Sequence, residues 1–456
     1  TLIHADQSGF IPNRNTFLNI RRLLYIINEA EQMEEGPVAV SLDIEKAFDT
    51  MGWQYLHEVL QAMQFGPIFA KWLRTIYKDP MARVKVGREI SDSFPICRGT
   101  RQGCPLSPMI FAIAMEPLAC YLRSRAVQWG IRIRNEFQII SLYADDALVF
   151  LRDPDTINTD LMTVLSEFGR ISGLQVNWPK SCVFPLKHNA ALPGRNILNA
   201  NISWNYDTFK YLGINVYRSE VDLLDGNIYK VLRSLRGSLK FWTALPLSPM
   251  GRISISKMLI LPRLLYFFSA LPLSIPKRFF TDLNRFLGEL IWGPHRHRVT
   301  MSKLYAQLDE GGLGVPNIEW YYAAAQLQWP ARWLATDPCP ERDQIQRVLK
   351  SKHIYHWLTD TDPGTHGESI WMRAAKKAWR RYVQGRLDTP PYSPLLTLEM
   401  APPIKTVERH HDLATWREAG ITEMRDLYED GIPYTFQAIS DMYTINPAHF
   451  LKYNAM

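Results

Sequence analysis

The chain has 456 residues, of which 46% are hydrophobic and 21% charged, so its composition excludes a disordered or fibrous polypeptide. Five cysteines, an odd number without a CxxC pair, argue against a disulfide framework and a zinc site, and we expect a reducing compartment. The net charge of +7 is modest, and the longest apolar stretch, 259–273, is too short for a membrane helix of about 20 residues, so we expect no membrane partner.

Strand and helix signals alternate through the first half of the chain, which predicts an α/β or α+β core. The first strand signal is in residues 37–43, where Val38, Val40 and Leu42 alternate with small or polar residues. This period of two predicts a half-buried strand that ends at Asp43.

Apolar residues recur at helical spacing in 53–63 and again in 69–77, which predicts two helices whose aromatic residues belong to the core. Residues 82–90 have the pattern of a hairpin around a glycine, and a Ser-Pro pair precedes an apolar helical run over 109–126. These elements continue the mixed helix and strand pattern.

Residues 139–150 predict two short apolar strands that meet at Asp145 and Asp146, a hairpin with two acids at its tip. The stretch 209–216 is the clearest later strand candidate, and from about residue 227 the chain becomes helical and rich in tryptophan. The expected domain boundaries lie near residues 220 and 305.

Basic residues are concentrated in two segments. Residues 227–304 contain 13 Lys or Arg against only Asp282 and Glu289, and 371–386 contain six basic residues and no acid, with aromatics between them. Cations with interleaved rings suit a nucleic-acid backbone and unpaired bases. The alternative is a solvated helix face whose aromatics pack inward.

Three carboxylates carry the strongest chemical signal: Asp43 at the end of one strand, and Asp145 and Asp146 at the tip of a later hairpin. If the strands are neighbours, the acids converge, and divalent cations would relieve their repulsion. Two Mg²⁺ ions held in this way suit nucleotidyl transfer. The alternative is an ordinary Asp-Asp turn exposed to solvent.

Several motifs resemble those of one enzyme family in order and spacing. They are SLDIEKAFD (41–49), RQGCPLSP (101–108), YADD (143–146), GLQVNWPKS (173–181) and KYLG (210–213), and together they resemble a reverse transcriptase. The upstream QSGFIPNR and the downstream segments LSPMGRISISKMLILPRLLYFFSALPL, EGGLGVPN and HHDLATWREAGI are similar to the open reading frame 2 protein of LINE-1-like non-LTR retrotransposons.

The resemblance implies that Asp43, Asp145 and Asp146 are the catalytic metal ligands, while Ile44 contributes its backbone carbonyl to the substrate site. Phe48 matches an aromatic beneath the incoming sugar that excludes the 2′-hydroxyl, although its position also fits a core phenylalanine.

Other motif positions imply substrate contacts. Gln102 and Gly103 match a loop against template and nucleotide, and Lys180 matches a lysine near the triphosphate. Arg14 and Arg22 are further candidate triphosphate contacts in the fingers stretch.

The implied fold is an α+β right-hand polymerase. Residues 1–220 would form the palm with partial fingers, 221–305 a helical basic thumb, and 306–456 a helical C-terminal region with a basic face. The thumb match favours the nucleic-acid interpretation of the first basic segment. The chain starts at Thr1 without an initiator Met, and the family's endonuclease, Cys/His-rich segment and first part of the fingers are not recognisable, so we expect a piece of a longer protein.

The implied activity is RNA-directed DNA synthesis with two Mg²⁺ ions, for which Mn²⁺ could substitute. The expected partners are an RNA template, a DNA primer or target and dNTPs, in a ribonucleoprotein of nucleus and cytoplasm. One alternative is a catalytically inactive nucleic-acid-binding remnant of a retrotransposon. A group II intron maturase is a third interpretation, disfavoured by the resemblance downstream of residue 227. The oligomeric state stays open.

Overall fold

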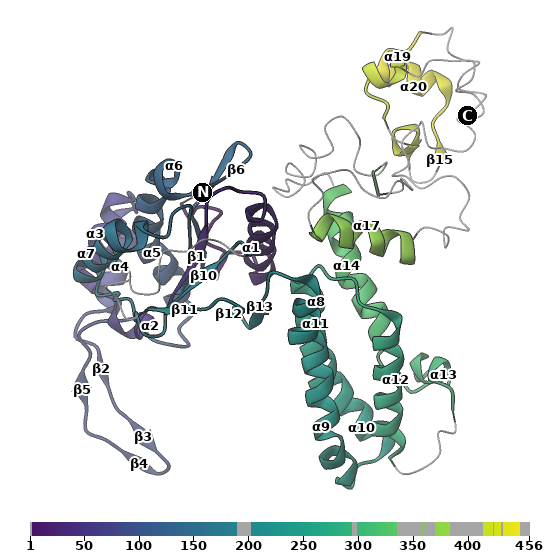
Figure 1. Ribbon diagram of the computed structural model, residues 1–456, viewed down its shortest axis with the longest axis horizontal. Coiled ribbons are helices and arrows are strands. Elements are labelled where there is room, and N and C mark those ends of the chain that lie inside the picture. Colours follow the sequence, from purple (N-terminus) through teal and green to yellow (C-terminus); the bar gives the residue numbers. More distant parts are fainter. Residues whose placement is uncertain are drawn as a thin grey trace. The chain divides into compact units, whose positions relative to one another are not determined.

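The computed structural model describes residues 2–188, 202–293, 299–334, 357–358, 370–383, 414–422, 424–429 and 432–446. The chain forms two compact units, Thr1–Ser234 and Leu235–Met456 (Figure 1). The first unit combines helices with a sheet, as an α+β core requires, and the described part of the second is mainly helical.

The core of the first unit is a five-stranded sheet with β1 at its centre. The central strand runs antiparallel to both of its neighbours. In spatial order the strands are β11 (Ser203–Trp204), β10 (Cys182–Pro185), β1 (Val38–Leu42), β9 (Asp146–Leu151) and β8 (Ile140–Tyr143).

Both faces of this sheet are covered. Val40 and Val149 belong to a core shared with α3 (Trp53–Ala62), α5 (Ser107–Ser124) and α7 (Met162–Ser172). On the opposite face Ala39 and Phe150 are also fully buried, and α1 (Thr16–Ala30) lies on that side (Figure 1). The prediction of a half-buried β1 is therefore wrong, because alanine fits beneath a covering layer as well as it fits a solvated face.

The helix predicted around residues 69–77 is α4 (Pro67–Ile76), but its assignment to the core is wrong for part of its surface. Trp72 is 67% exposed and Ile76 is 53% exposed, and Leu73 is the buried residue of the helix. Only a narrow face of this helix contacts the core. The helical spacing of its apolar residues therefore predicted more burial than the structure shows.

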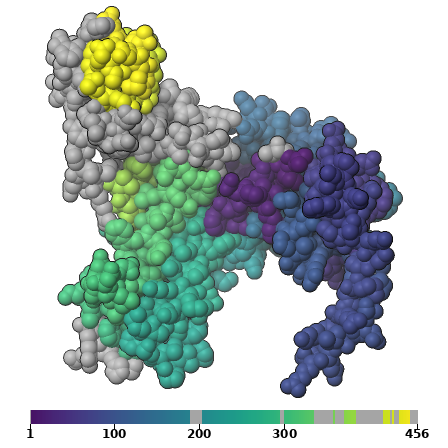
Figure 2. Space-filling view, turned by 180° about the vertical axis from the view of Figure 1, so that it is seen from behind, coloured from purple at the N-terminus to yellow at the C-terminus, as the bar shows by residue number. Residues whose placement is uncertain are grey.

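An extended ribbon follows α4 and projects away from the rest of the unit (Figures 1 and 2). Its tip is the predicted hairpin around Gly87, whose φ of 61° suits a residue without a Cβ. The ribbon contains β2 (Met81–Ala82), β3 (Lys85–Val86), β4 (Glu89–Ile90) and β5 (Phe94–Pro95).

The stretch 209–216 is a hairpin and not the single strand that its composition predicted. Leu212 and Gly213 both have positive φ, 46° and 80°, and reverse the chain between the two strands. The remaining elements of the first unit are α2 (Ala47–Thr50), α6 (Ala126–Trp129), β6 (Ile131–Ile133), β7 (Glu136–Gln138), η1 (Ile157–Leu161), β12 (Phe209–Tyr211), β13 (Ile214–Val216), α8 (Glu220–Leu223) and η2 (Leu224–Tyr229).

Helix α9 (Lys230–Ala244) begins in the first unit, and most of its length belongs to the second. The described part of the second unit contains α10 (Pro249–Ile255), η3 (Ser256–Ile260), α11 (Leu261–Ala270), α12 (Lys277–Trp292), α13 (Met301–Tyr305), α14 (Ile318–Leu334), α17 (Ile370–Tyr382), α19 (Ala414–Glu418), η5 (Met424–Leu427), β14 (Tyr428–Glu429), β15 (Ile432–Pro433) and α20 (Phe436–Tyr443).

One helical stretch among the described residues, Pro249–Ala270, has 22 residues and by length and composition could cross a membrane; 39% of an apolar 18-residue stretch within it is buried inside the protein. It is longer than the apolar stretch predicted from sequence, because α10, η3 and α11 follow one another without a break. It also carries Arg252, Lys257 and Arg263, and cations are costly at the centre of a bilayer.

Helix α17 contains most of the second basic segment, and its aromatic residues pack inward. Trp371 is 6% exposed and contacts Trp333, with the ring centroids 5.4 Å apart. Lys376 is also buried, over the ring of Trp357. Trp371 and Lys376 therefore face inward, whereas Arg373 and Lys377 are exposed, and residues 384–386 lie outside the described residues.

Candidate active site

The sheet brings together the strand ends that carry the three predicted catalytic aspartates. Leu42 of β1 pairs with Ala147 of β9, so Asp43 lies beside Asp146 one position further along the same register. Asp145 is in the turn that joins β8 to β9. Residues a hundred positions apart in sequence thus form one acidic edge of the sheet.

Burial and the charges of neighbouring carboxylates shift the pKa values of Asp145 and Asp146. Partial removal of water by the surrounding protein, followed by the charges of Asp145 and Asp43, raises the pKa of Asp146 to about 6. Desolvation and the charge of Asp43 also raise the pKa of Asp145 above its usual range. A bound divalent cation would relieve the repulsion between these neighbouring carboxylates.

The turn between β8 and β9 has an unusual backbone. Tyr143 pairs with Asp146 across it, which leaves Ala144 and Asp145 as its two central residues. Ala144 has a φ of 55°, in the left-handed region that glycine adopts more readily. A strained turn of this kind persists only when neighbouring groups hold it.

The backbone around Asp43 is held by the segment that contains the NWPKS motif. The Asp43 N–H donates to Ser181 Oγ at 3.0 Å, and the Asn177 N–H donates to the Asp43 carbonyl at 2.7 Å. Ile44 forms an antiparallel bridge with Val176, and its side chain is buried. The sequence analysis missed Ser181 and Asn177, although the motif that contains them was the available signal.

Lys180 lies in the same segment, and its side chain is exposed. Its backbone N–H donates to the Asn177 carbonyl at 3.1 Å, so the lysine is tied to the residue that contacts Asp43. The structure therefore places this predicted triphosphate contact on the segment beside the acidic edge.

Phe48, in α2, has a half-buried ring. It stacks on Phe111 with the ring centroids 4.6 Å apart, and Phe10 approaches it edge-on at 6.5 Å. The ring is thus fixed against the core on one side, which is compatible with both interpretations of this residue, packing and sugar selection.

The loop with Gln102 and Gly103 is exposed and is anchored next to α2. The Thr100 N–H donates to the Phe48 carbonyl at 2.6 Å, which places the loop close to the proposed sugar-contacting ring. Gly103 has a φ of 82°, and a Cβ there would meet nothing within 4 Å. Within this chain, glycine at this position permits the positive φ, and no neighbouring atom fills the space next to it.

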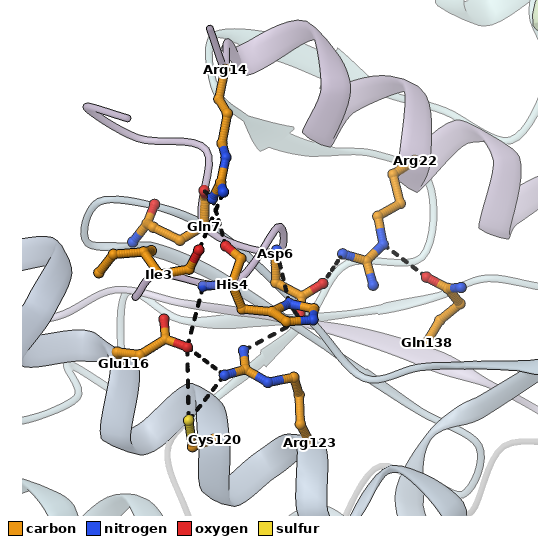
Figure 3. Close-up of polar contacts among 10 residues, drawn as sticks. All are labelled: Ile3, His4, Asp6, Gln7, Arg14, Arg22, Glu116, Cys120, Arg123 and Gln138. Carbon is orange, nitrogen blue, oxygen red and sulfur yellow. Dashed lines mark hydrogen bonds and ion pairs between the residues drawn. The ribbon is translucent and has the colours of Figure 1, made fainter. Parts of the chain in front are cut away.

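The two arginines of the predicted fingers stretch make contacts within the protein. Arg14 donates to the carbonyl oxygens of His4 at 2.6 Å and Gln7 at 2.7 Å, and Arg22 pairs with Asp6 at 2.6 Å (Figure 3). These guanidinium groups hold the N-terminal segment, and a contact of either with a triphosphate stays a prediction.

The donor chemistry of the acidic edge fits a hard divalent cation, which prefers carboxylate oxygens. No group of three His, Cys, Asp or Glu side chains in the described ranges is arranged as a ready-made metal site. Substrate phosphates would have to complete the ligand set, as is usual for Mg²⁺.

Comparison with known proteins identifies the chain. Residues 1–216 match the reverse transcriptase (RNA-dependent DNA polymerase) family. The transposon TX1 uncharacterized 149 kDa protein of Xenopus laevis is 30% identical over 75% of this chain and 26% of its own length. A retrovirus-related Pol polyprotein from the type-1 retrotransposable element R2 of Popillia japonica is 27% identical over 76% of this chain and 50% of its own length.

This chain was also compared with solved structures. The structure of telomerase from Candida albicans in complex with a fragment of telomeric RNA aligns with this chain at a TM-score of 0.36 and 12% sequence identity. The alignment covers 76% of this chain and 54% of the telomerase chain.

The acidic edge and the family match define residues 1–216 as a reverse transcriptase domain. Beyond this domain, the chain is similar to proteins of the transposable elements TX1 and R2. It spans between a quarter and a half of the length of the two relatives described above.

Proposed function

We propose that the chain is an RNA-directed DNA polymerase that extends a DNA 3′ end on an RNA template. The observation that carries this proposal is the meeting of Asp43, Asp145 and Asp146 at one edge of the β1–β9 pair, within a reverse transcriptase domain. The substrates are dNTPs, and the primer is a DNA strand or target.

The roles of the site residues follow from their places around this edge. Asp43, Asp145 and Asp146 would hold two Mg²⁺ ions, which would supply Lewis acidity to the 3′-hydroxyl and to the leaving pyrophosphate. Phe48 would exclude the ribose 2′-hydroxyl, and Lys180 would stabilise charge on the triphosphate. Gln102 and Gly103 would lie against the template and nucleotide.

We assign the palm and partial fingers to residues 1–220, a helical basic thumb to 221–305 and a helical C-terminal region with a basic face to 306–456. Exposed basic side chains within residues 221–305 support the thumb assignment. Lys257 and Arg263 are two of them, and both belong to the second unit. A polymerase that uses RNA and DNA would act as a nuclear and cytoplasmic ribonucleoprotein without a membrane partner.

Primer extension on poly(rA)/oligo(dT) with Mg²⁺ tests the proposal. The wild-type chain should extend the primer, whereas Asp145→Asn should lower the rate by at least about 100-fold with template-primer affinity nearly unchanged. Asp153→Asn, which changes an exposed aspartate in the loop after β9, is the matched control and should extend normally.

Extension by Asp145→Asn at the wild-type rate would refute the site. Absence of extension by a wild-type chain that still binds template-primer would favour the inactive nucleic-acid-binding remnant.

A further inference from the structure

Beyond these roles, the N-terminal segment Asp6–Gly9 braces the turn that carries Asp145 and Asp146. Strand β8 is at the edge of the sheet, and Gln7 forms a parallel bridge with its residue Leu142. The Leu142 N–H donates to the Asp6 carbonyl at 2.8 Å, and the Ser8 N–H donates to the Leu142 carbonyl at 2.9 Å. The segment therefore covers the edge strand directly beside the turn.

The side chain of Gln7 reaches the turn itself. Its Oε1 accepts the Ala144 N–H at 3.0 Å and the Gly9 N–H at 2.9 Å, and the side chain is buried. Two backbone donors fix which end of the amide faces the turn, because only the oxygen can accept both. The Nε2 group is buried and has no hydrogen-bond partner among the described residues. Gln7 thus acts on the turn through its oxygen alone.

Gly9 leaves no space between the segment and the turn. A Cβ on this residue would lie 2.3 Å from the Ala144 nitrogen and 2.9 Å from the Tyr143 carbonyl carbon. The segment is in turn fixed by Arg14, which donates to the Gln7 carbonyl (Figure 3). The close approach of Gly9 and the hydrogen bond from the Ala144 N–H to Gln7 together hold the backbone of Ala144 at its left-handed φ.

We propose that Gln7 is a positioning residue for catalysis: its Oε1 holds the Ala144 turn so that Asp145 and Asp146 face Asp43 at the geometry that nucleotidyl transfer needs. The kinetic part of this inference rests on the proposed polymerase function, whereas its structural part does not. Gln7 touches no reacting atom and acts through the turn.

The test compares four full-length chains: wild type, Gln7→Leu, Gln7→Glu and Gln326→Leu. Leucine is close to glutamine in size but accepts no hydrogen bond. Glutamate keeps the accepting oxygen, and burial beside the acidic edge favours its uncharged, protonated form. Gln326→Leu is the matched control, because it removes a buried glutamine whose amide donates to the Phe268 carbonyl in the other unit.

The first readout is amide hydrogen exchange, measured on a peptide that spans 140–147 and on one that spans β1. Gln7→Leu should speed exchange in the turn by about tenfold or more and leave β1 unchanged. Gln7→Glu and Gln326→Leu should leave both peptides unchanged. Equal exchange of the turn in wild type and Gln7→Leu would overturn the inference, whether or not the chain extends a primer.

The second readout is single-turnover primer extension. Gln7→Leu should lower the maximal rate by about 10- to 100-fold, with the nucleotide half-saturation concentration and the template-primer Kd changed by less than about twofold. Gln7→Glu should retain the rate within about threefold, and Gln326→Leu should match wild type. A Gln7→Leu rate within about twofold of wild type would also overturn the inference.

If Gln7→Leu does not fold, Gly9→Ala replaces it, because the added Cβ would lie 2.3 Å from the Ala144 nitrogen and 3.1 Å from Gln7 Oε1, and so would disturb the same contact between segment and turn. It should give the same faster turn exchange and lower maximal rate, and normal values for both would overturn the inference. A wild-type chain that never extends a primer would defeat the proposed function alone, since the exchange comparison would still decide whether Gln7 holds the turn.

Discussion

The raised pKa of Asp146 makes metal-dependent activity sensitive to pH near 6. With a pKa of about 6, this carboxylate is mostly ionised at pH 7 and mostly protonated at pH 5. Only the ionised form can ligate a cation, so the half-saturating Mg²⁺ concentration should rise about twofold at pH 6 and about tenfold at pH 5, relative to pH 8.

The same shift has the opposite effect on the stability of the metal-free protein. Because the folded pKa is above the usual 3.8, the folded chain binds more protons than the unfolded chain between these values. The free energy of unfolding therefore decreases as the pH rises from about 4 to about 6. Asp146→Asn removes this penalty. Because the Asp146 carboxylate is only partly desolvated and solvent still reaches it, we expect a gain of no more than about 1 kcal/mol at pH 8, or about 2–4 °C in Tm.

The assay combines Mg²⁺ titrations of primer extension at pH 5, 6, 7 and 8 with thermal unfolding of the metal-free chain at pH 4 and pH 8. Asp153→Asn serves as the control for loss of an aspartate outside the acidic edge. A half-saturating Mg²⁺ concentration that does not change between pH 5 and pH 7 would refute the reasoning. So would an Asp146→Asn variant less stable than wild type at pH 8.

Three further predictions concern the sugar gate, the basic helices and the support of the acidic edge. Phe48→Ala should raise ribonucleotide incorporation relative to deoxynucleotide by about 10- to 100-fold in single-nucleotide kinetics, because the clash with the 2′-hydroxyl is lost; equal slowing of both sugars would make Phe48 a packing residue. Replacing Lys257 and Arg263 by alanine should weaken template-primer binding and reduce its logarithmic salt slope by about one per lost phosphate contact; an unchanged slope would assign both to a solvated face. Ser181→Ala should leave the Asp43 N–H without its acceptor and lower the free energy of unfolding by about 1–3 kcal/mol in urea titrations, together with slower extension; wild-type values in both assays would contradict this role.

Local sequence patterns were sufficient to predict secondary-structure elements that depend mainly on their own residues. The period-two apolar residues of β1 and the two acids at the tip of the later hairpin predicted strands that the structure contains. Burial was less predictable, because it depends on which layer covers a face. Ala39 is buried and Trp72 is exposed, and neither follows from residue type.

The sequence by itself indicated the reverse transcriptase domain, the three candidate aspartates and the uneven distribution of basic residues, since these depend on residue type and order. The tertiary structure decided which groups meet. Only the pairing of β1 with β9 puts Asp43 beside Asp146, and only the covering of β8 by the N-terminal segment brings Gln7 to Ala144. A hydrogen bond between residues 137 positions apart leaves no local trace in a sequence, because its donor and acceptor are a backbone amide and a side chain that become neighbours only when the sheet forms.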